Sequence, residues 1–107
     1  MTGERFIATM LAMTSEADPL RHRSVVETTH YKLITVLVRD QEQAVKVCKD
    51  LVNEEGVESF LLCPGFTSKG VGKIAEAVGD NISVNVARGS GPSNAIARKA
   101  NKRMGLV

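Results

Sequence analysis

The sequence contains no tryptophan, and aromatic residues make up only 4% of its 107 residues. Its core is therefore expected to consist mainly of valine, isoleucine, leucine, alanine and methionine. It has only two cysteines, Cys48 and Cys63, and no Cys-x-x-Cys pair. This pattern argues against a disulfide framework and indicates reduced thiols, so a cytoplasmic location is expected.

Long hydrophobic runs are also missing. The first apolar run covers only the eight residues 6–13, which is too short to span a membrane, and no signal-type cleavage site accompanies it. A membrane is therefore not expected as a partner. Apolar residues at 43% and charged residues at 24% are ordinary for a globular protein.

Acidic residues are absent from the last part of the chain. None follows Asp80, so the first 80 residues carry a charge of −3 and the last 27 carry +5, within a net charge of +2. The basic residues of this segment are Arg88, Arg98, Lys99, Lys102 and Arg103. Such a segment suits an anionic ligand or the acidic face of another subunit, and equally a solvated helix face. Nucleic acid is not expected, because no aromatic platform accompanies the charge.

Strand and helix patterns alternate along the chain. Strands are expected over residues 6–13, 31–39, 57–62 and 82–87. Helices are expected over 19–27, from Asp40 to Gly56, from 67 or 68 to 79, and from 92 to about 104. The last helix is expected to bury Ala95, Ile96, Ala100 and Met104.

This alternation predicts a single α/β domain over residues 1–107. We expect a three-layer sandwich of about four mostly parallel strands, with the flavodoxin-like order 2-1-3-4. The expected helix over 19–27 would carry the crossover between the first two strands. If that segment is not a helix, the first strand is expected to lie antiparallel beside the second.

Ligands of open parallel sheets bind outside the carboxyl ends of the strands. Two loops belong at this edge, one with Cys63, Gly65 and Phe66, and one with Arg88, Gly89 and Ser90. Each leads into a helix N-terminus, which favours anions, and an arginine adds a bidentate contact to carboxylate or phosphate. Neither loop matches the Walker or Gly-x-Gly-x-x-Gly patterns, and the glycines fit simple tight turns equally well.

Two places carry candidate reactive groups. Cys63, at a strand end before a helix, fits a nucleophile or acid/base, or else a small buried apolar residue. On the expected 19–27 helix, Arg23 would hold an anion, His22 would transfer protons and Glu27 would orient it. An exposed helix with an ordinary ion pair is the alternative. Cys48 lies on an apolar helix stripe and is expected in the core.

The chain resembles a family of short bacterial α/β proteins of uncharacterised function, over residues 5 to 88. The similarity includes Asp18-Pro19, His22-Arg23 and Glu27-Thr28, then Cys63-x-Gly65-Phe66, Gly70-Val71 and the segment 74–79, and a last strand ending at Arg88. The resemblance implies that His22, Arg23, Glu27, Cys63, Gly65 and Arg88 form one constellation. The chain is more loosely similar to the cysteine-containing strand ends of amino-acid racemases, which use two cysteines. Because this chain offers one, the similarity implies a second subunit or another base.

These observations predict a protein that binds an anionic small metabolite, carboxylate or phosphate, at the carboxyl edge of its sheet. A cofactor-independent lyase or isomerase fits the candidate residues, and neither a cofactor nor a metal site is expected because no ligand spacing is present. A homo-oligomer is expected, because 107 residues form only a shallow pocket alone. The alternative is a non-catalytic oligomeric binding or assembly module.

Overall fold

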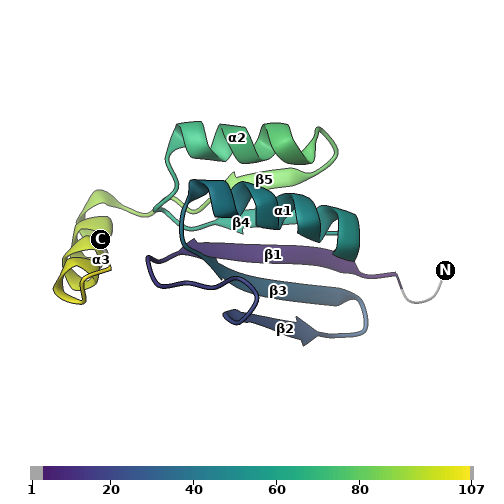
Figure 1. The fold of residues 1–107 in the computed structure, drawn as a ribbon, viewed down its shortest axis with the longest axis horizontal. Coiled ribbons are helices and arrows are strands. Elements are labelled where there is room, and N and C mark those ends of the chain that lie inside the picture. Colours follow the sequence, from purple (N-terminus) through teal and green to yellow (C-terminus); the bar gives the residue numbers. More distant parts are fainter. Residues whose placement is uncertain (1–3, 107) are drawn as a thin grey trace.

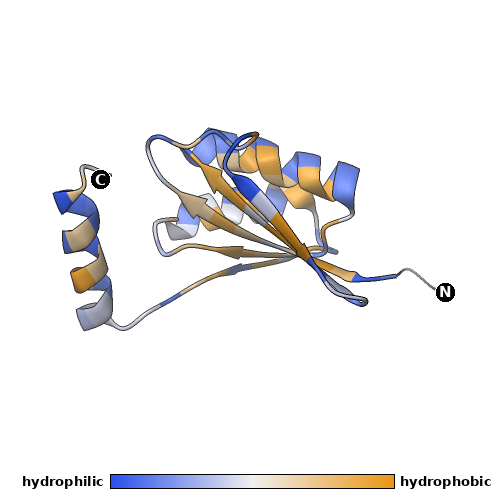
Figure 2. Cartoon of the chain, turned by 90° about the horizontal axis from the view of Figure 1, so that it is seen from below, coloured by the Kyte–Doolittle hydropathy of each residue, from blue (hydrophilic) through white to orange (hydrophobic). Residues whose placement is uncertain are grey.

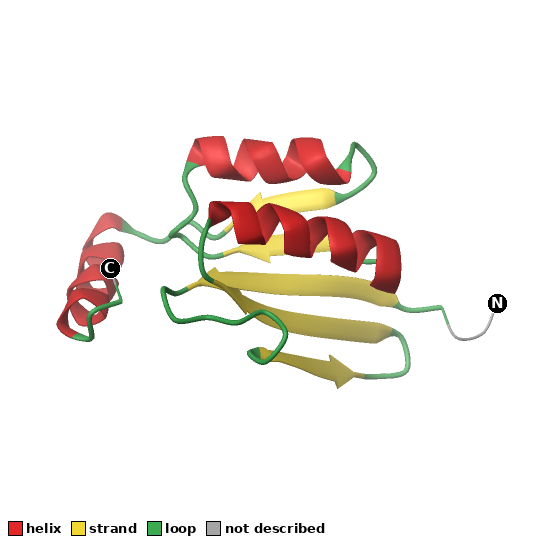
Figure 3. Cartoon of the chain, viewed as in Figure 1, coloured by secondary structure: helices red, strands yellow, loops and turns green. Residues whose placement is uncertain are grey.

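A computed structural model describes residues 4–106 of the chain. These residues form five strands and three helices, and Figures 1 and 3 show how they are arranged. In chain order they are β1 (Phe6–Met13), β2 (Arg23–Glu27), β3 (Tyr31–Val38), α1 (Gln41–Glu55), β4 (Ser59–Leu62), α2 (Ser68–Val78), β5 (Ser83–Val86) and α3 (Gly91–Arg103). The sequence thus predicts all of these elements except β2 to within a few residues.

The strands form one sheet in the order β2-β3-β1-β4-β5. The pairs β1–β3, β1–β4 and β4–β5 are parallel, while β2 runs antiparallel to β3 at the edge. The fold is therefore mixed α/β with a mostly parallel sheet. Because an antiparallel edge strand is added and no helix connects β1 to β2, the order alone does not establish a flavodoxin-like fold.

The predicted helix over residues 19–27 is wrong. Only one turn forms there, in which the amides of Arg21 and His22 donate to the carbonyl of Asp18 at 3.0 and 2.7 Å. The chain then enters β2, where Val25 pairs with Ile34. The two valines of this stretch favour an extended backbone, and β2 forms a hairpin with β3. Strand β1 nevertheless pairs parallel with β3, so the antiparallel alternative is also wrong.

Local signals in the sequence explain where α1 begins and ends. The Asp40 carboxylate accepts from the amide of Gln43 at 2.8 Å, and the Gln43 side chain accepts from the amide of Arg39 at 2.6 Å. This reciprocal arrangement is a variant of the capping box. At the other end, Gly56 has φ of 71°, a left-handed conformation that favours glycine.

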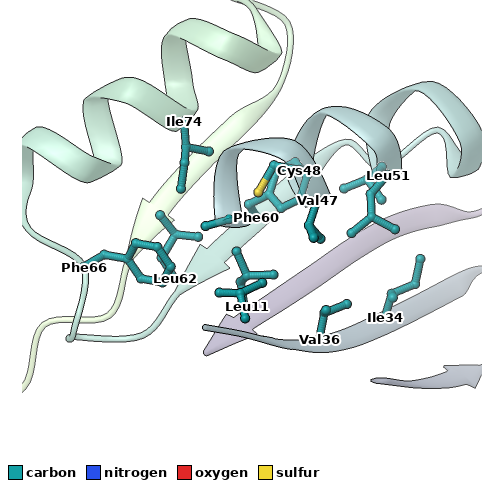
Figure 4. Close-up of a cluster of buried hydrophobic side chains, with 13 residues drawn as sticks. Leu11, Ile34, Val36, Val47, Cys48, Leu51, Phe60, Leu62, Phe66 and Ile74 are labelled. Atoms are coloured by element: carbon teal, nitrogen blue, oxygen red, sulfur yellow. The ribbon is translucent and has the colours of Figure 1, made fainter. Parts of the chain in front are cut away.

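The hydrophobic core lies between the sheet and the pair α1 and α2, as Figure 4 shows. Its largest fully buried side chains include Phe60 and Leu62 of β4, Leu11 of β1 and Ile74 of α2. Cys48 of α1 is fully buried among them, as the helical stripe predicts. The core is mostly aliphatic, in agreement with the scarcity of aromatic residues.

Residues 4–106 do not form the expected three layers. Helices α1 and α2 lie on the same side of the sheet, and in Figure 2 no helix of the described part of the chain covers the other side. The missing layer follows from residues 19–27, which form a turn and β2 in place of a helix. Helix α3 extends beyond the end of the sheet, so the chain measures 48 × 27 × 27 Å. None of its residues is buried, so the prediction that it buries Ala95, Ile96, Ala100 and Met104 is wrong.

Among residues 4–106, no helix is both long and apolar enough to cross a membrane.

Candidate functional site

A cavity of about 380 Å³ opens at the carboxyl edge of the sheet. Its lining comes from the end of β1 at Met13, from residues 39–41 between β3 and α1, and from residues 65–73 between β4 and the first half of α2. Strand β1 is the middle strand of the five, with β3 and β4 on either side. The cavity thus occupies the place where open parallel sheets usually bind ligands.

The N-terminal turns of two helices meet at this cavity. Thr67 is the N-cap of α2, and its hydroxyl accepts from the amide of Gly70 at 3.0 Å. The side chain of Gln41, at the start of α1, donates to the carbonyl of Gly70 at 3.1 Å. Because helix N-termini carry partial positive charge, their meeting makes the cavity favourable for an anion.

Three cationic side chains, Arg39, Lys69 and Lys73, also line the cavity. Lys69 and Lys73 stand four residues apart on α2, and therefore on one face of that helix. Asp40 is the one carboxylate in the lining, and the amide of Gln43 already occupies one of its oxygens. The lining is therefore net positive, in contrast with the −3 charge of the first 80 residues as a whole.

Apolar side chains form another part of the wall. Phe66 is buried and packs in the core, while Met13 is half-buried. Gly65 precedes Phe66 in a turn where the amide of Phe66 donates to the carbonyl of Cys63 at 3.2 Å. Gly65 and Phe66, two of the residues expected to bind substrate, thus do line the cavity.

Cys63 lies beside this cavity without lining it. Its sulfur lies 3.4 Å from the position that a Cβ at Gly65 would take, and its half-buried side chain packs against the core. Of the residues expected to be catalytic, Cys63 is the one adjacent to the cavity. No acid or base among the described residues is hydrogen-bonded to its thiol.

The other two expected catalytic residues, His22 and Glu27, lie elsewhere, and so does Arg23, which is expected to hold an anion. The His22 Nδ1 accepts from the amide of Asp18 at 2.9 Å, and the Arg23 Nε donates to the carbonyl of Pro19 at 2.7 Å. Glu27 forms an ion pair with Arg5 at the far end of β2. Along a strand, Arg23 and Glu27 are about 13 Å apart, whereas a helix would have made them neighbours.

Arg88, Gly89 and Ser90 follow β5, on the edge of the sheet opposite β2. The Ser90 hydroxyl accepts from the amide of Ser93 at 3.3 Å and serves as the N-cap of α3. Four strand spacings separate β2 from β5, which is about 19 Å. The structure therefore does not bring His22, Arg23, Glu27 and Arg88 together around Cys63, and the single constellation implied by the resemblance does not form.

The site residues expected from the sequence do not include the six polar residues of the cavity lining, which are Arg39, Asp40, Gln41, Thr67, Lys69 and Lys73. The sequence does contain a signal that places Arg39, Asp40 and Gln41 near the site. In the expected order 2-1-3-4, the ends of the second and third strands flank the end of the first, so the Arg39–Gln41 loop faces the Cys63–Gly70 loop. From the sequence, Arg39 is expected only to end a strand and Asp40 only to cap a helix.

Cys48 differs from Cys63 in reactivity. Burial raises the pKa of the Cys48 thiol from its ordinary value of 9.0 to about 12, so it is a protonated core residue at neutral pH. Within residues 4–106, no group of three or more histidine, cysteine, aspartate or glutamate side chains is arranged to hold a metal ion.

A family described as "Family of unknown function (DUF6506)" matches residues 6–101. The match extends beyond Arg88 and includes most of α3, so the similarity reaches further than the sequence motifs predict. No curated protein and no solved structure shows a significant similarity to the chain.

Proposed function

We propose a function from the geometry of this chain itself, because the chain belongs to the family of unknown function DUF6506, whose description assigns no activity. The proposed function is the binding of an anionic small metabolite, a carboxylate or phosphate, in the cavity at the carboxyl ends of β1, β3 and β4. One observation carries the proposal: two helix N-termini and three cationic side chains converge on one cavity.

Electrostatics supports an anion. Arg39 provides a planar guanidinium that can hold two oxygens of one carboxylate or phosphate, while Lys69 and Lys73 contribute point charges. The amides of the first helical turns are free to donate, apart from those that the caps already occupy. A bound anion would also relieve the mutual repulsion of Lys69 and Lys73.

The size and the walls of the cavity narrow the ligand class. A volume of about 380 Å³ is near the lower end for small-molecule sites, which commonly span roughly 300–1,000 Å³. Met13 and Phe66 provide an apolar wall. We therefore favour a small metabolite with one anionic group and a short apolar part over a bare polyanion.

The proposal covers binding and does not extend to turnover. The lining has no histidine, cysteine or glutamate, and its one carboxylate, Asp40, caps α1. A lyase or isomerase would need Cys63 to reach a ligand past Gly65. The two free thiols are compatible with a cytoplasmic protein.

Binding can be tested by isothermal titration calorimetry with a panel of inorganic phosphate, pyrophosphate, acetate, butyrate and a short acyl phosphate. The expected result is binding that weakens with added salt and falls at least tenfold in Arg39→Gln, since one charge-assisted hydrogen bond contributes about 1.5–3 kcal/mol. Lys69→Gln and Lys73→Gln should each weaken binding less. The matched control is Lys49→Gln, which removes the same charge from an exposed position of α1 outside the cavity lining.

Equal affinity in wild type and the triple variant Arg39→Gln, Lys69→Gln, Lys73→Gln would contradict the proposal. So would a loss of affinity in Lys49→Gln equal to that in Arg39→Gln, because it would show a non-specific charge effect.

The alternative, a non-catalytic assembly module, is favoured by a different observation, the side of the sheet that no helix covers. The two functions are compatible, because the cavity lies at the end of the strands and the uncovered side lies along them.

A further inference from the structure

The uncovered side of the sheet presents alternate residues of all five strands. The strand registers place Phe6, Met10, Tyr31 and Leu61 on this side. The complete set is Phe6, Ala8, Met10 and Ala12 of β1, Ser24 and Val26 of β2, Tyr31, Leu33, Thr35 and Leu37 of β3, Ser59 and Leu61 of β4, and Ser83 and Asn85 of β5. We call this surface the open face.

The open face carries no charged side chain on any of its described strand residues. The charged residues within the strands, Arg23, Glu27 and Lys32, all point to the side of the helices. Nine of the fourteen open-face residues are apolar. A surface exposed to water normally includes charged residues, so this composition indicates burial against another surface.

Large apolar side chains are exposed across the open face. Phe6, Met10, Tyr31 and Leu61 are 45%, 44%, 43% and 38% exposed. The rings of Phe6 and Tyr31 pack edge to face with centroids 5.4 Å apart, and so form a rigid apolar block at one end of the face. Parallel strands are almost always covered on both sides, and here β1 and β4 are covered on one only.

The accessible surface of the chain is also larger than its mass predicts. It amounts to 7140 Å², whereas a compact monomer of 11.5 kDa exposes about 5,800 Å². The excess is roughly 1,300 Å², and a stable interface needs about 800 Å² from each partner. The projecting α3 contributes to this excess, as do the exposed apolar side chains of the open face. The chain thus exposes more surface than a compact monomer of its mass, as is expected for one subunit of a dimer.

Helix α3 of the same chain is too small to cover the open face. Its 13 residues span about 20 Å in one row, whereas the other side of the sheet is covered by two helices, α1 and α2. Its four cationic side chains, Arg98, Lys99, Lys102 and Arg103, would also meet a surface without acidic partners. A second open face, in contrast, matches the first in width, in length and in its lack of charge.

We propose that two copies of this chain form a homodimer by packing their open faces together, sheet against sheet. The interface is isologous: both copies use the same surface, and each contact between two residues occurs twice, related by a two-fold axis. Met10 lies in the middle of β1, the central strand, and therefore near that axis. The two sheets would be about 10 Å apart, and the two cavities would remain accessible at the strand ends.

The test is the mass in solution, measured by sedimentation and by light scattering over a dilution series. The wild-type chain should have twice its mass of 11.5 kDa, and Met10→Glu should have the mass of one chain. Circular dichroism should be unchanged, because Met10 is half exposed in a single chain. If Met10→Glu is unfolded, Leu61→Ser serves as the second variant, with the same expected loss of the dimer.

Two controls identify the surface. Leu20→Glu changes an apolar loop residue that is 82% exposed, and Ile96→Glu changes one on α3 that is 70% exposed. Both should remain dimeric. A wild-type chain that is monomeric at 100 µM overturns the proposal, as does a folded Met10→Glu that remains dimeric. Dissociation by Ile96→Glu but not by Met10→Glu overturns it as well, because it places the contact on α3.

Discussion

The side-chain Nε2 of Gln41 in α1 donates to the main-chain carbonyl of Gly70 in α2 over 3.1 Å. This bond joins the first turns of two helices that follow different strands. It requires close approach, because a Cβ at Gly70 would overlap the Gln41 amide and come within 3.3 Å of the Thr67 hydroxyl. Gly70 therefore lets the two helix N-termini meet and helps define the cavity.

The effect of Gly70→Ala on stability should depend on Gln41. In the wild-type background the added methyl group displaces the Gln41 amide and breaks the bond, which offsets the higher helix propensity of alanine. In Gln41→Ala the methyl group no longer meets the Gln41 amide, and only its 3.3 Å approach to the Thr67 hydroxyl remains. In that background, Gly70→Ala should raise the free energy of unfolding by about 0.5–1 kcal/mol. Urea denaturation of the four proteins measures the coupling, expected to be at least about 0.5 kcal/mol. Additive effects would contradict the close contact.

Thr9 should be more stable as valine. Its hydroxyl is fully buried on the helix side of β1 and has no hydrogen-bond partner among residues 4–106. Valine has the same shape without the buried hydroxyl, so Thr9→Val should raise the free energy of unfolding by about 1–2 kcal/mol. Thermal unfolding measures the gain. Thr29→Val, at an exposed position between β2 and β3 and outside the open face, is the matched control and should change stability by less than about 0.5 kcal/mol. A destabilised Thr9→Val would indicate an unseen partner.

The two cysteines should react differently in the folded protein. Cys48 is buried in the core and its thiol stays protonated, whereas Cys63 is half exposed at the strand end. A thiol reagent at pH 8 should label one cysteine per chain in native protein and two in denaturant. Peptide mapping should place the native label on Cys63. Rapid native labelling of Cys48 would contradict the described core.

The raised pKa of Cys48 also predicts a loss of stability in alkali. In the unfolded chain this thiol ionises near 9.0, and in the folded chain only near 12. Between these values the unfolded state binds fewer protons, so the free energy of unfolding falls as pH rises, by at most about 1.4 kcal/mol per pH unit. The effect vanishes well below pH 9, where the thiol is protonated in both states. Urea denaturation at pH 8 and pH 10 should show a smaller decline in Cys48→Ala, and equal declines would contradict the assignment.

Local signals account for most of the fold that the sequence predicts. Asp40 with Gln43, Thr67, Gly56 and Pro92 mark helix ends through short-range hydrogen bonds and dihedral preferences, and these do not depend on distant residues. The structure of residues 19–27, in contrast, depends on contacts with a distant part of the sequence. Asp18-Pro19 resembles a helix start, but a turn also begins this way, and pairing with β3 makes Val25 and Val26 a strand.

The candidate site could be predicted only in part, because some of its residues are placed by the order of the strands. Its general position follows from parallel topology, which explains why Gly65 and Phe66 were identified. The positions of Glu27 and Arg88 depend on which strands lie at the edges of the sheet. The unexpected β2 forms one edge and carries Glu27, whereas Arg88 follows β5 at the other edge. The open face could not be predicted either. The sequence pattern of α3 predicts a helix, but it does not show whether that helix packs on the sheet or extends away from it.

The most direct test of the proposed binding site is a two-dimensional amide NMR titration of uniformly labelled full-length protein with an anion that binds in calorimetry. Saturable shifts are expected for the amides of residues 39–43 and 65–73, which surround the cavity, and not for those of residues 91–103 in α3. Shifts confined to α3 or to the Arg88 loop, or the absence of saturable shifts across the anion panel, would contradict anion binding in this cavity.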